Sequence, residues 1–339
     1  MSKRPSITYQ VTTVLREAFE EGHGRSRHAD KKNALNNRKP IDTYTKDKIY
    51  SRNTYNSTKK TCVAYANFCK EEYGIRYLQE IKPEMFDRFI ERGSVLGKSY
   101  EQNTAAAYFS QTKKLENAFN SLTGGNVKFA DKSYKQYVVE NVQVKERMPS
   151  ELHDRIIEKA YEQKIENGLA LDSSRALGLR VSEITNLRKE DFKFKDRELQ
   201  SVHIHRSKGG RKRDILAKGL SEGKIEKILK VYDYFKDKLQ DHDRLFTNRA
   251  SSYETVFRRI RDSIPGGEQY KGCGIHSMRK EFAQEYFDRE LEKRLRERKS
   301  DIERILETQK KIEIEIKEEL TELLGHSRIE VLKSYLSND

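Results

Sequence analysis

The C-terminal half of the chain carries six polar residues whose side chains suit the handling of one phosphate group: Arg180, Lys208, His276, Arg279, His326 and Tyr335. Each arginine can present a planar pair of N–H donors to phosphate oxygens, and imidazole and amine groups can donate hydrogen bonds and move protons. An ordinary phenol is about a thousandfold under-ionised at pH 7, a deficit of roughly 4 kcal/mol that nearby cations can offset. Tyr335 is therefore the candidate nucleophile.

The spacing of these residues fits a shared site. Arg180 and Glu183 lie one helical turn apart in GLRVSE, so the carboxylate can hold the guanidinium. Lys208 precedes two glycines in SKGGRKR, which predicts a tight hairpin turn. His276 and Arg279 lie three apart in HSMR, so both side chains leave the same face of a helix.

Each residue also has an ordinary structural explanation when taken alone. A tyrosine spaced with leucines can be a core residue of a terminal helix, and an arginine near a glutamate can be a helix ion pair. A lysine beside glycines can be a turn residue, and a histidine at a helix start can be a cap. The complete set, in this order, favours the shared phosphate site.

The segments GLRVSE, SKGGRKR, HSMR and LLGHSRIEVLKSYL resemble those of the tyrosine recombinases, the lambda-integrase-like site-specific recombinases and phage integrases. The resemblance covers about residue 150 to the C-terminus by motif and the N-terminal part only by architecture. It implies a C-shaped clamp in which a helical core-binding domain and a catalytic domain grip opposite faces of a DNA duplex.

The resemblance also implies a role for each residue. Arg180 and Arg279 would clamp the phosphate, with Glu183 as partner of the first arginine. Lys208 would protonate the 5′-oxygen leaving group. The two histidines, His276 and His326, would hydrogen-bond the phosphate and assist proton transfer, while Tyr335 forms a 3′-phosphotyrosyl intermediate. No cofactor, metal or ATP is implied.

Two departures from the family pattern stand out. Lys280 occupies the position where the family commonly has a histidine after its second arginine, which we expect to change only the surroundings of the site. The interval between Arg279 and His326 is about twice the usual one, and its excess is a charged stretch at 289–319, in which 20 of 31 residues are charged. We expect long helices there that replace, as a contact between protomers or with DNA, the tail that many relatives carry after the tyrosine. The alternative is a solvated helix that makes no such contact.

The predicted fold class is α+β and mostly helical. We expect a basic N-terminal extension at 1–45, a helical core-binding (SAM-like) DNA-binding domain at 46–147, and a tyrosine recombinase catalytic domain at 148–339 with a small antiparallel sheet. Composition supports two domains of ordinary size, because 339 residues suffice for about two.

Apolar periodicity and punctuation predict the individual elements. In the first domain we expect a helix that stops at Gly74, a second that Pro83 opens, a third from about 99 to 124 and a fourth at about 132–142. In the second domain we expect helices near 150–166, 181–189, 221–239, 251–263 and from 276 onward, with a hairpin whose strands flank Gly209 and Gly210.

The charge composition points to a polyanionic partner. Lysine and arginine outnumber aspartate and glutamate by 68 to 54, a net charge of +14, and residues 1–60 alone hold 14 basic against 6 acidic residues. A solvated basic tail is the alternative for that stretch. We expect a cytoplasmic protein without a membrane partner, because no apolar run approaches bilayer length, and the cysteines Cys62, Cys69 and Cys273 suggest neither disulfides nor structural zinc.

These observations predict a site-specific DNA recombinase, most simply the integrase or transposase of a mobile genetic element. The expected partners are double-stranded DNA at recombination or attachment sites and further copies of the chain, as a tetramer in the synapse. An accessory DNA-bending protein or excision factor is a further candidate partner. The alternatives are a type IB topoisomerase-like or hairpin-forming strand transferase, a chromosome-dimer-resolving recombinase, and an architectural DNA-binding protein without catalysis.

Overall fold

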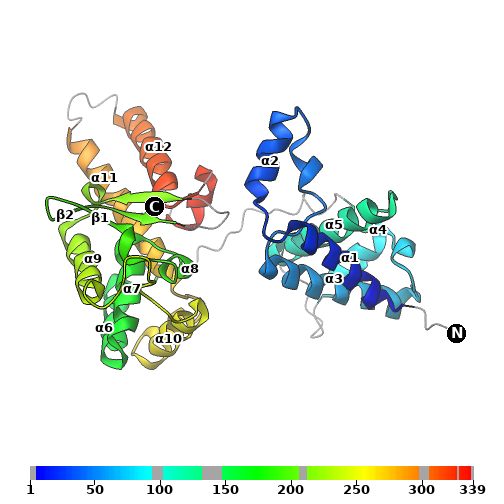
Figure 1. The fold of residues 1–339 in the computed structure, drawn as a ribbon, viewed down its shortest axis with the longest axis horizontal. Helices are drawn as coiled ribbons and strands as arrows, with labels where there is room; N and C mark the ends of the chain where they lie inside the picture. The colour runs from blue at the N-terminus through cyan, green and yellow to red at the C-terminus, as the bar shows by residue number, and fades with distance from the viewer. Residues whose placement is uncertain are drawn as a thin grey trace. The chain divides into compact units, whose positions relative to one another are not determined.

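The computed structural model describes residues 5–93, 102–131, 147–205, 212–297, 305–326 and 328–336 (Figure 1). The chain divides into two compact units, residues 1–142 and 143–339. Both are mostly helical, and the second contains a small antiparallel sheet, as the sequence predicts. The functional assignment of the predicted domains and the clamp arrangement stay predictions.

The first unit is a bundle whose elements are α1 (Ile7–Gly22), α2 (Arg27–Asn36), η1 (Ile41–Tyr44), α3 (Arg52–Tyr73), η2 (Leu78–Glu80), α4 (Pro83–Arg92) and α5 (Gln102–Thr123). Helix α3 ends at Gly74, whose φ of 68° suits a residue without a Cβ atom. The predicted stop at Gly74 and start at Pro83 are confirmed. The predicted helix at 132–142 lies outside the described residues.

Aromatic side chains fill the centre of this unit. The ring of Tyr65 contacts Phe86 edge-on at 5.5 Å between centroids and Phe89 at 5.2 Å, and its hydroxyl donates to the carbonyl of Phe129 at 3.0 Å. The buried tyrosine therefore keeps its polar atom satisfied while its ring contributes to the core. Cys62 and Cys69 are also buried in this core.

Part of the stretch predicted as a basic extension is not a tail. Residues Ile7, Val11, Leu15 and Ala18 recur at helical spacing along α1 and are all buried against the bundle. A count of basic residues over 1–60 does not reveal this apolar stripe. Its burial holds α1 against the rest of the bundle. Helix α1 is an integral element of the first unit.

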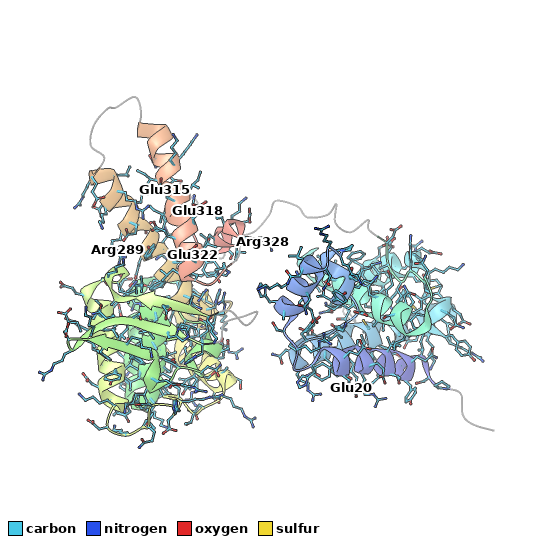
Figure 2. The ribbon with its side chains drawn as sticks, turned by 45° about the horizontal axis from the view of Figure 1, so that its top comes forward. Glu20, Arg289, Glu315, Glu318, Glu322 and Arg328 are labelled. Atoms are coloured by element: carbon cyan, nitrogen blue, oxygen red, sulfur yellow. The ribbon has the colours of Figure 1, made fainter. Side chains whose placement is uncertain are left out.

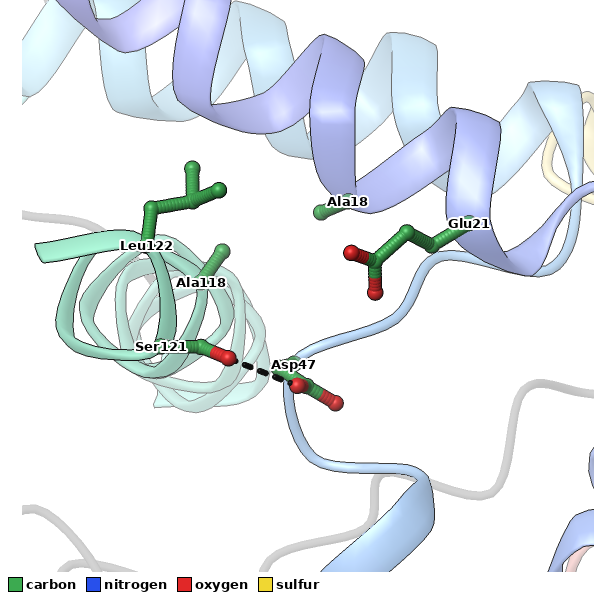
Figure 3. Close-up of a pocket in the computed structure, with 6 residues that line it drawn as sticks. All are labelled: Ala18, Glu21, Asp47, Ala118, Ser121 and Leu122. Atoms are coloured by element: carbon green, nitrogen blue, oxygen red, sulfur yellow. Dashed lines mark hydrogen bonds between the residues drawn. The ribbon is translucent and has the colours of Figure 1, made fainter. Parts of the chain in front are cut away.

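A small hollow lies in the first unit between α1, α5 and the segment before α3 (Figure 3). The hydroxyl of Ser121 donates to Asp47 across it at 2.9 Å, and Glu21 lines its other side. Its cavity volume of about 10 Å³ leaves room for one water molecule at most. The hollow is a packing feature and not a ligand site.

The helical elements of the second unit are α6 (Ser150–Gln163), α7 (Ile165–Leu177), α8 (Val181–Ile184), η4 (Lys189–Asp191), η5 (Ala217–Gly219), α9 (Glu222–Phe235), α10 (Ala250–Ser263), η6 (Gly267–Tyr270), α11 (His276–Glu297), α12 (Ile305–Leu323) and η8 (Ile329–Ser334). Helix α7 lies at the centre, in contact with α6, α9, α10 and α11. The sequence pattern did not predict α7. Even Asp172 and Arg175 of this helix are buried, so it has no exposed polar face that would alternate with an apolar face at helical spacing.

The sheet consists of three antiparallel strands in the order β1 (Phe192–Lys195), β2 (Glu198–Ile204) and β3 (Arg213–Leu216). Strands β2 and β3 form the predicted hairpin, with Ile204 opposite Arg213. Strand β1 was not predicted, and it turns into β2 through Asp196 and Arg197, which both have positive φ angles. Gly209 and Gly210 lie outside the described residues.

Helices α11 and α12 pack against each other as a pair that carries most of the charged stretch 289–319. The inner face of α12 is apolar, and Ile312 and Ile316 have no exposed surface. Its outer face presents Glu315, Glu318 and Glu322 (Figure 2). The stretch is thus an amphipathic element whose apolar side belongs to the core.

The described residues contain no group of three or more histidine, cysteine, aspartate or glutamate side chains arranged to hold a metal ion. Among the same residues, no helix is long and apolar enough to cross a membrane.

Candidate active site

Tyr335 sits immediately after η8, at the end of the chain segment that follows α12. Its side chain packs in a cluster with Leu332 and Leu336, and the residue is 8% exposed. The same cluster includes Leu320 of α12 and Leu324, which follows the helix directly, so Tyr335 packs against the inner face and the end of α12. The predicted helix around the tyrosine is in fact a short 3₁₀ segment.

Both predicted histidines contact the ring of Tyr335. His276, the first residue of α11, lies 5.2 Å from it between ring centroids, and His326 lies at the same distance. Both contacts are edge-on, at interplanar angles of 71° and 68°. The two imidazoles, 50 residues apart in sequence, therefore converge on one phenol.

The two predicted arginines meet at Glu183, whose side chain is fully buried. Arg180 donates from Nη1 to Glu183 Oε1 at 2.8 Å and from its backbone N–H to Oε2 at 3.0 Å. Nη1 of Arg279 lies 3.5 Å from Oε2. The guanidinium of Arg279 also lies over the ring of Tyr335, 5.8 Å from its centroid. The carboxylate thus links both arginines beside the tyrosine.

Two helix ends supply carbonyl groups that hold Arg279. Its Nη1 donates to the carbonyl of Gly178 at 2.5 Å, and its Nη2 donates to the carbonyl of Leu324. Nη1 of Arg180 also reaches the carbonyl of Leu324, at 3.4 Å. The last carbonyls of a helix lack partners within the helix and carry partial negative charge, so they suit a guanidinium.

Glycine in a left-handed conformation ends both of these helices. Gly178, with φ of 61°, caps α7, and Arg180 follows two residues later. Gly325, with φ of 64°, follows α12, and the backbone N–H of His326 donates back to Thr321 at 2.8 Å. In each case the glycine turns the chain sharply and directs the next segment into the site.

The electrostatic setting keeps both histidines neutral at pH 7 in the DNA-free chain. Burial and the positive charges of Arg279 and nearby cations lower the pKa of His276 to about 4, and the same causes lower that of His326 to about 4. Burial, together with the charge of Arg180, lowers the pKa of the Arg279 guanidinium to about 10, so it stays protonated. The site therefore combines neutral imidazoles with fixed positive charge.

Two lysines, Lys208 and Lys280, complete the predicted site residues. Lys208 lies outside the described residues, so its place in the site stays a prediction. Lys280 follows Arg279 on α11 and is half-buried. Its charge is among the causes that lower the pKa of His276. The expected role of Lys280 in the surroundings of the site stays a prediction.

Sequence reasoning missed Arg213, the first residue of β3. It donates from Nη1 to Glu183 Oε1 at 3.1 Å and from Nη2 to Oε2 at 2.9 Å. Burial by itself would raise the pKa of Glu183, but the hydrogen bonds and charge of Arg213, with the charge of Arg279, lower it to about 2. The arginine was visible in SKGGRKRDIL, but a basic turn gave no reason to single it out.

A buried polar network under the start of α11 was also missed. Glu281 accepts from Arg175 at 3.0 Å, and its other oxygen lies 2.6 Å from Nδ1 of His153. The opposite ring nitrogen of His153 lies 2.8 Å from the hydroxyl of Ser277. Because Ser277 follows His276 directly, this network fixes the helix turn that presents His276 and Arg279.

Comparison with known proteins identifies a family domain in the C-terminal unit. The model of the phage integrase family matches residues 146–310. The C-terminal unit carries a phage integrase domain. The matched stretch contains Arg180, Lys208, His276 and Arg279, and it ends before His326 and Tyr335. No curated protein sequence matches the chain.

Solved structures extend the likeness of the phage integrase domain to most of the chain. XerH site-specific recombinase bound to difH substrate is 16% identical with a TM-score of 0.57, covering 98% of this chain and 95% of that one. A lambda integrase dimer bound to a COC′ core site is 15% identical with a TM-score of 0.53, covering 84% and 88%. The Tn1549 transposon integrase in complex with transposon right end DNA is 15% identical with a TM-score of 0.51, covering 93% and 96%. At these identities the likeness establishes the shared recombinase fold.

Proposed function

We propose that this protein is a tyrosine site-specific recombinase that cleaves and rejoins DNA through a 3′-phosphotyrosyl intermediate. The observation that carries the proposal is the convergence of His276, His326 and the buried Arg279 on the ring of Tyr335. A tyrosine in an ordinary core does not collect two neutral imidazoles and a guanidinium around its ring. The same convergence suits a phenol that must lose its proton and attack a phosphorus atom.

In the proposed cleavage step, the phenolic oxygen of Tyr335 forms a bond to the scissile phosphorus and the bond from phosphorus to the 5′-oxygen breaks. One of the neutral histidines accepts the phenolic proton, directly or through water. Lys208 donates a proton to the departing 5′-oxygen. A 5′-hydroxyl from another strand reverses the step, because the phosphotyrosyl bond keeps the energy of the phosphodiester. Neither ATP nor a metal ion is needed.

The charge of the arginine cluster matches this reaction. Attack by a phenolate on a phosphodiester passes through a dianionic transition state. The guanidiniums of Arg180, Arg213 and Arg279 around the one carboxylate of Glu183 leave a net charge of +2. Fixed charge of this kind in a water-poor site stabilises the transition state more than the ground state, in which the phosphate group itself carries one negative charge less.

The DNA-free chain must rearrange before it reacts. The side chain of Arg279 has no exposed surface, and Tyr335 is itself buried. A phosphate therefore reaches the guanidinium only if the side chains that cover it, Tyr335 among them, move aside. Binding of the DNA backbone supplies the free energy for this step in the proposal, and binding should be strongly salt-dependent.

The proposed partners are double-stranded DNA and further copies of the chain, assembled as a tetramer around two duplexes. The solved neighbours include a lambda integrase tetramer bound to a Holliday junction and the Tn1549 transposon integrase, which favours the integrase of a mobile genetic element. The second candidate is a topoisomerase-like enzyme, which would use the same site without exchanging strands between duplexes.

A nicked suicide substrate tests the proposal, because the short 5′ fragment diffuses away after cleavage and traps the covalent complex. We expect a protein–DNA adduct on a denaturing gel with the wild-type chain and none with Tyr335→Phe. Tyr234→Phe, which removes the hydroxyl of a tyrosine that pairs with Glu166 away from the site, should form the adduct normally. Absence of an adduct with the wild-type chain on cognate DNA would exclude the enzymatic proposal.

Joining of two differently labelled duplexes separates the enzymatic candidates. A recombinase yields a product that carries both labels. A topoisomerase-like enzyme forms the same adduct but only relaxes supercoiled DNA.

A further inference from the structure

Arg213 approaches the site from a different part of the fold than the other arginines. It opens β3 and pairs with Ile204 of β2, whereas Glu183 lies in α8. The two residues are 30 positions apart in sequence, so their contact depends on the register of the sheet. The side chain of Arg213 is 7% exposed, so the ion pair is shielded from water and from salt.

We propose that Arg213 is a positioning residue that keeps the Glu183 carboxylate engaged, so that Arg180 and Arg279 are aligned for the phosphate. This role rests on the proposed recombinase function. The proposed role is positioning and not phosphate binding, because Nη1 and Nη2 of Arg213 each donate to Glu183.

The geometry around Glu183 shows why such a residue is needed. A buried carboxylate beside a phosphate site repels the substrate, and an unpaired one attracts the nearest cations. Arg213 contacts both oxygens of the carboxylate, at 3.1 and 2.9 Å, while Arg279 approaches no closer than 3.5 Å. The carboxylate is thus satisfied mainly by Arg213 and by Arg180.

Loss of Arg213 would change how the remaining groups share the carboxylate. Glu183 would keep its charge in a fully buried place with one bidentate partner fewer. Arg279, already 3.5 Å away, is the cation best placed to move toward it. That movement would draw its guanidinium away from the carbonyl groups of Gly178 and Leu324 that now orient it. The net charge of the cluster would fall from +2 to +1.

The alternative is that Arg213 only fastens the β2–β3 hairpin to α8. The two roles differ in one respect. If Arg213 acts by neutralising the Glu183 carboxylate, then replacing that carboxylate by an uncharged group should restore part of the cleavage rate that is lost without Arg213. If Arg213 only fastens the hairpin, replacing the carboxylate as well should not restore the cleavage rate.

The test compares Arg213→Gln, Arg213→Lys and the double variant Glu183→Gln/Arg213→Gln in single-turnover cleavage of the suicide substrate. We expect Arg213→Gln to cleave about 10- to 100-fold more slowly, the range expected for misplaced reacting groups. The cleavage rate of Arg213→Lys should lie between those of Arg213→Gln and the wild type, because an ammonium group does not bridge both carboxylate oxygens as a guanidinium does. The double variant should cleave faster than Arg213→Gln. Arg258→Gln, on the exposed face of α10, controls for the loss of one positive charge.

A second measurement does not depend on activity. The Nε–H resonance of Arg279, followed by ¹⁵N NMR, should shift in folded Arg213→Gln and return toward its wild-type position in the double variant. An unshifted resonance, a cleavage rate of Arg213→Gln within twofold of wild type, or a double variant no faster than Arg213→Gln would each overturn the positioning role. A wild-type chain that forms no adduct would instead contradict the proposed function, and the NMR comparison would still decide the role of Arg213.

Discussion

The guanidinium of Arg279 lies over the aromatic ring of Tyr335, 5.8 Å from its centroid, and both residues are buried. The arginine comes from the first turn of α11 and the tyrosine from the end of the described chain. The end of α12 brings them together, because the carbonyl of Leu324, directly after the helix, accepts from Arg279, and the apolar face of the helix packs against Tyr335. The charged stretch at 289–319, which the sequence comparison treats as an excess over the family pattern, thus includes part of the helix that packs against Tyr335.

Substitution of Arg279 by lysine should uncouple DNA binding from cleavage. Lysine keeps the charge but cannot donate to Gly178 and Leu324 in the planar geometry seen here. We expect single-turnover cleavage to slow by about 100-fold or more, as for loss of one transition-state donor, with duplex affinity changed little. Arg258→Lys, on an exposed face, should leave the rate unchanged. A rate for Arg279→Lys within threefold of wild type would show that the fork geometry is unnecessary.

Gly178→Ala should destabilise the second unit. The residue has a φ of 61°, and an added Cβ atom would lie 2.5 Å from Cδ1 of Phe282. Left-handed backbone strain and the clash together should lower the free energy of unfolding by about 2 kcal/mol, measured by urea denaturation. The matched control is Gly223→Ala in α9, where an added Cβ meets nothing within 4 Å and helix propensity should make the change neutral or stabilising. Equal effects at the two positions would contradict the role of Gly178.

Glu281→Gln should be among the more destabilising single changes in this unit. The residue is 1% exposed, and its carboxylate contacts Arg175 and His153. Removal of its charge takes one of two carboxylate partners from the buried guanidinium of Arg175, which keeps only Asp154, for which we expect a loss of about 3 kcal/mol in urea denaturation. Glu292→Gln, which breaks the exposed pair with Arg296, should cost less than about 0.5 kcal/mol. A loss at Glu281 as small as that at Glu292 would mean that the network contributes little.

The stability of the DNA-free chain should fall as the pH is lowered from 6.5 to 4. The pKa values of His276 and His326 are lowered to about 4 in the folded chain, against an ordinary value of 6.5. Between these values the unfolded chain binds more protons than the folded chain, so acid favours unfolding. Carboxyls such as Glu183, with a pKa of about 2, add their effect only below about pH 4.5.

Urea midpoints measured across this pH range check the histidine effect. The double variant His276→Gln/His326→Gln should show a flatter profile than the wild type between pH 6.5 and 4. Profiles of equal slope would show that the two histidines titrate normally.

Local sequence signals predict several of the residue pairs in the candidate site. Arg180 with Glu183, and His276 with Arg279, are set by helical spacing, and glycine marks the helix ends that precede Arg180 and His326. These relationships act over a few residues, so the sequence displays them directly.

Relationships set by tertiary packing could not be predicted in this way. The contact of Arg213 with Glu183 depends on strand register, and α7 has no polar face because it is buried on all sides. The stripe of apolar residues on α12 was visible, but only packing shows that it supports Tyr335. The fold class and most helices were therefore predictable, whereas the partners that arrange the site required the structure.

The central claim is that Tyr335 attacks DNA, and the most direct measurement is the mass of the covalently modified peptide. The adduct formed on a suicide substrate is digested with nuclease and protease, and the peptide that carries the residual nucleotide is sequenced by tandem mass spectrometry. The proposed function predicts a nucleotide 3′-phosphate on Tyr335. A nucleotide attached to any other residue would contradict it.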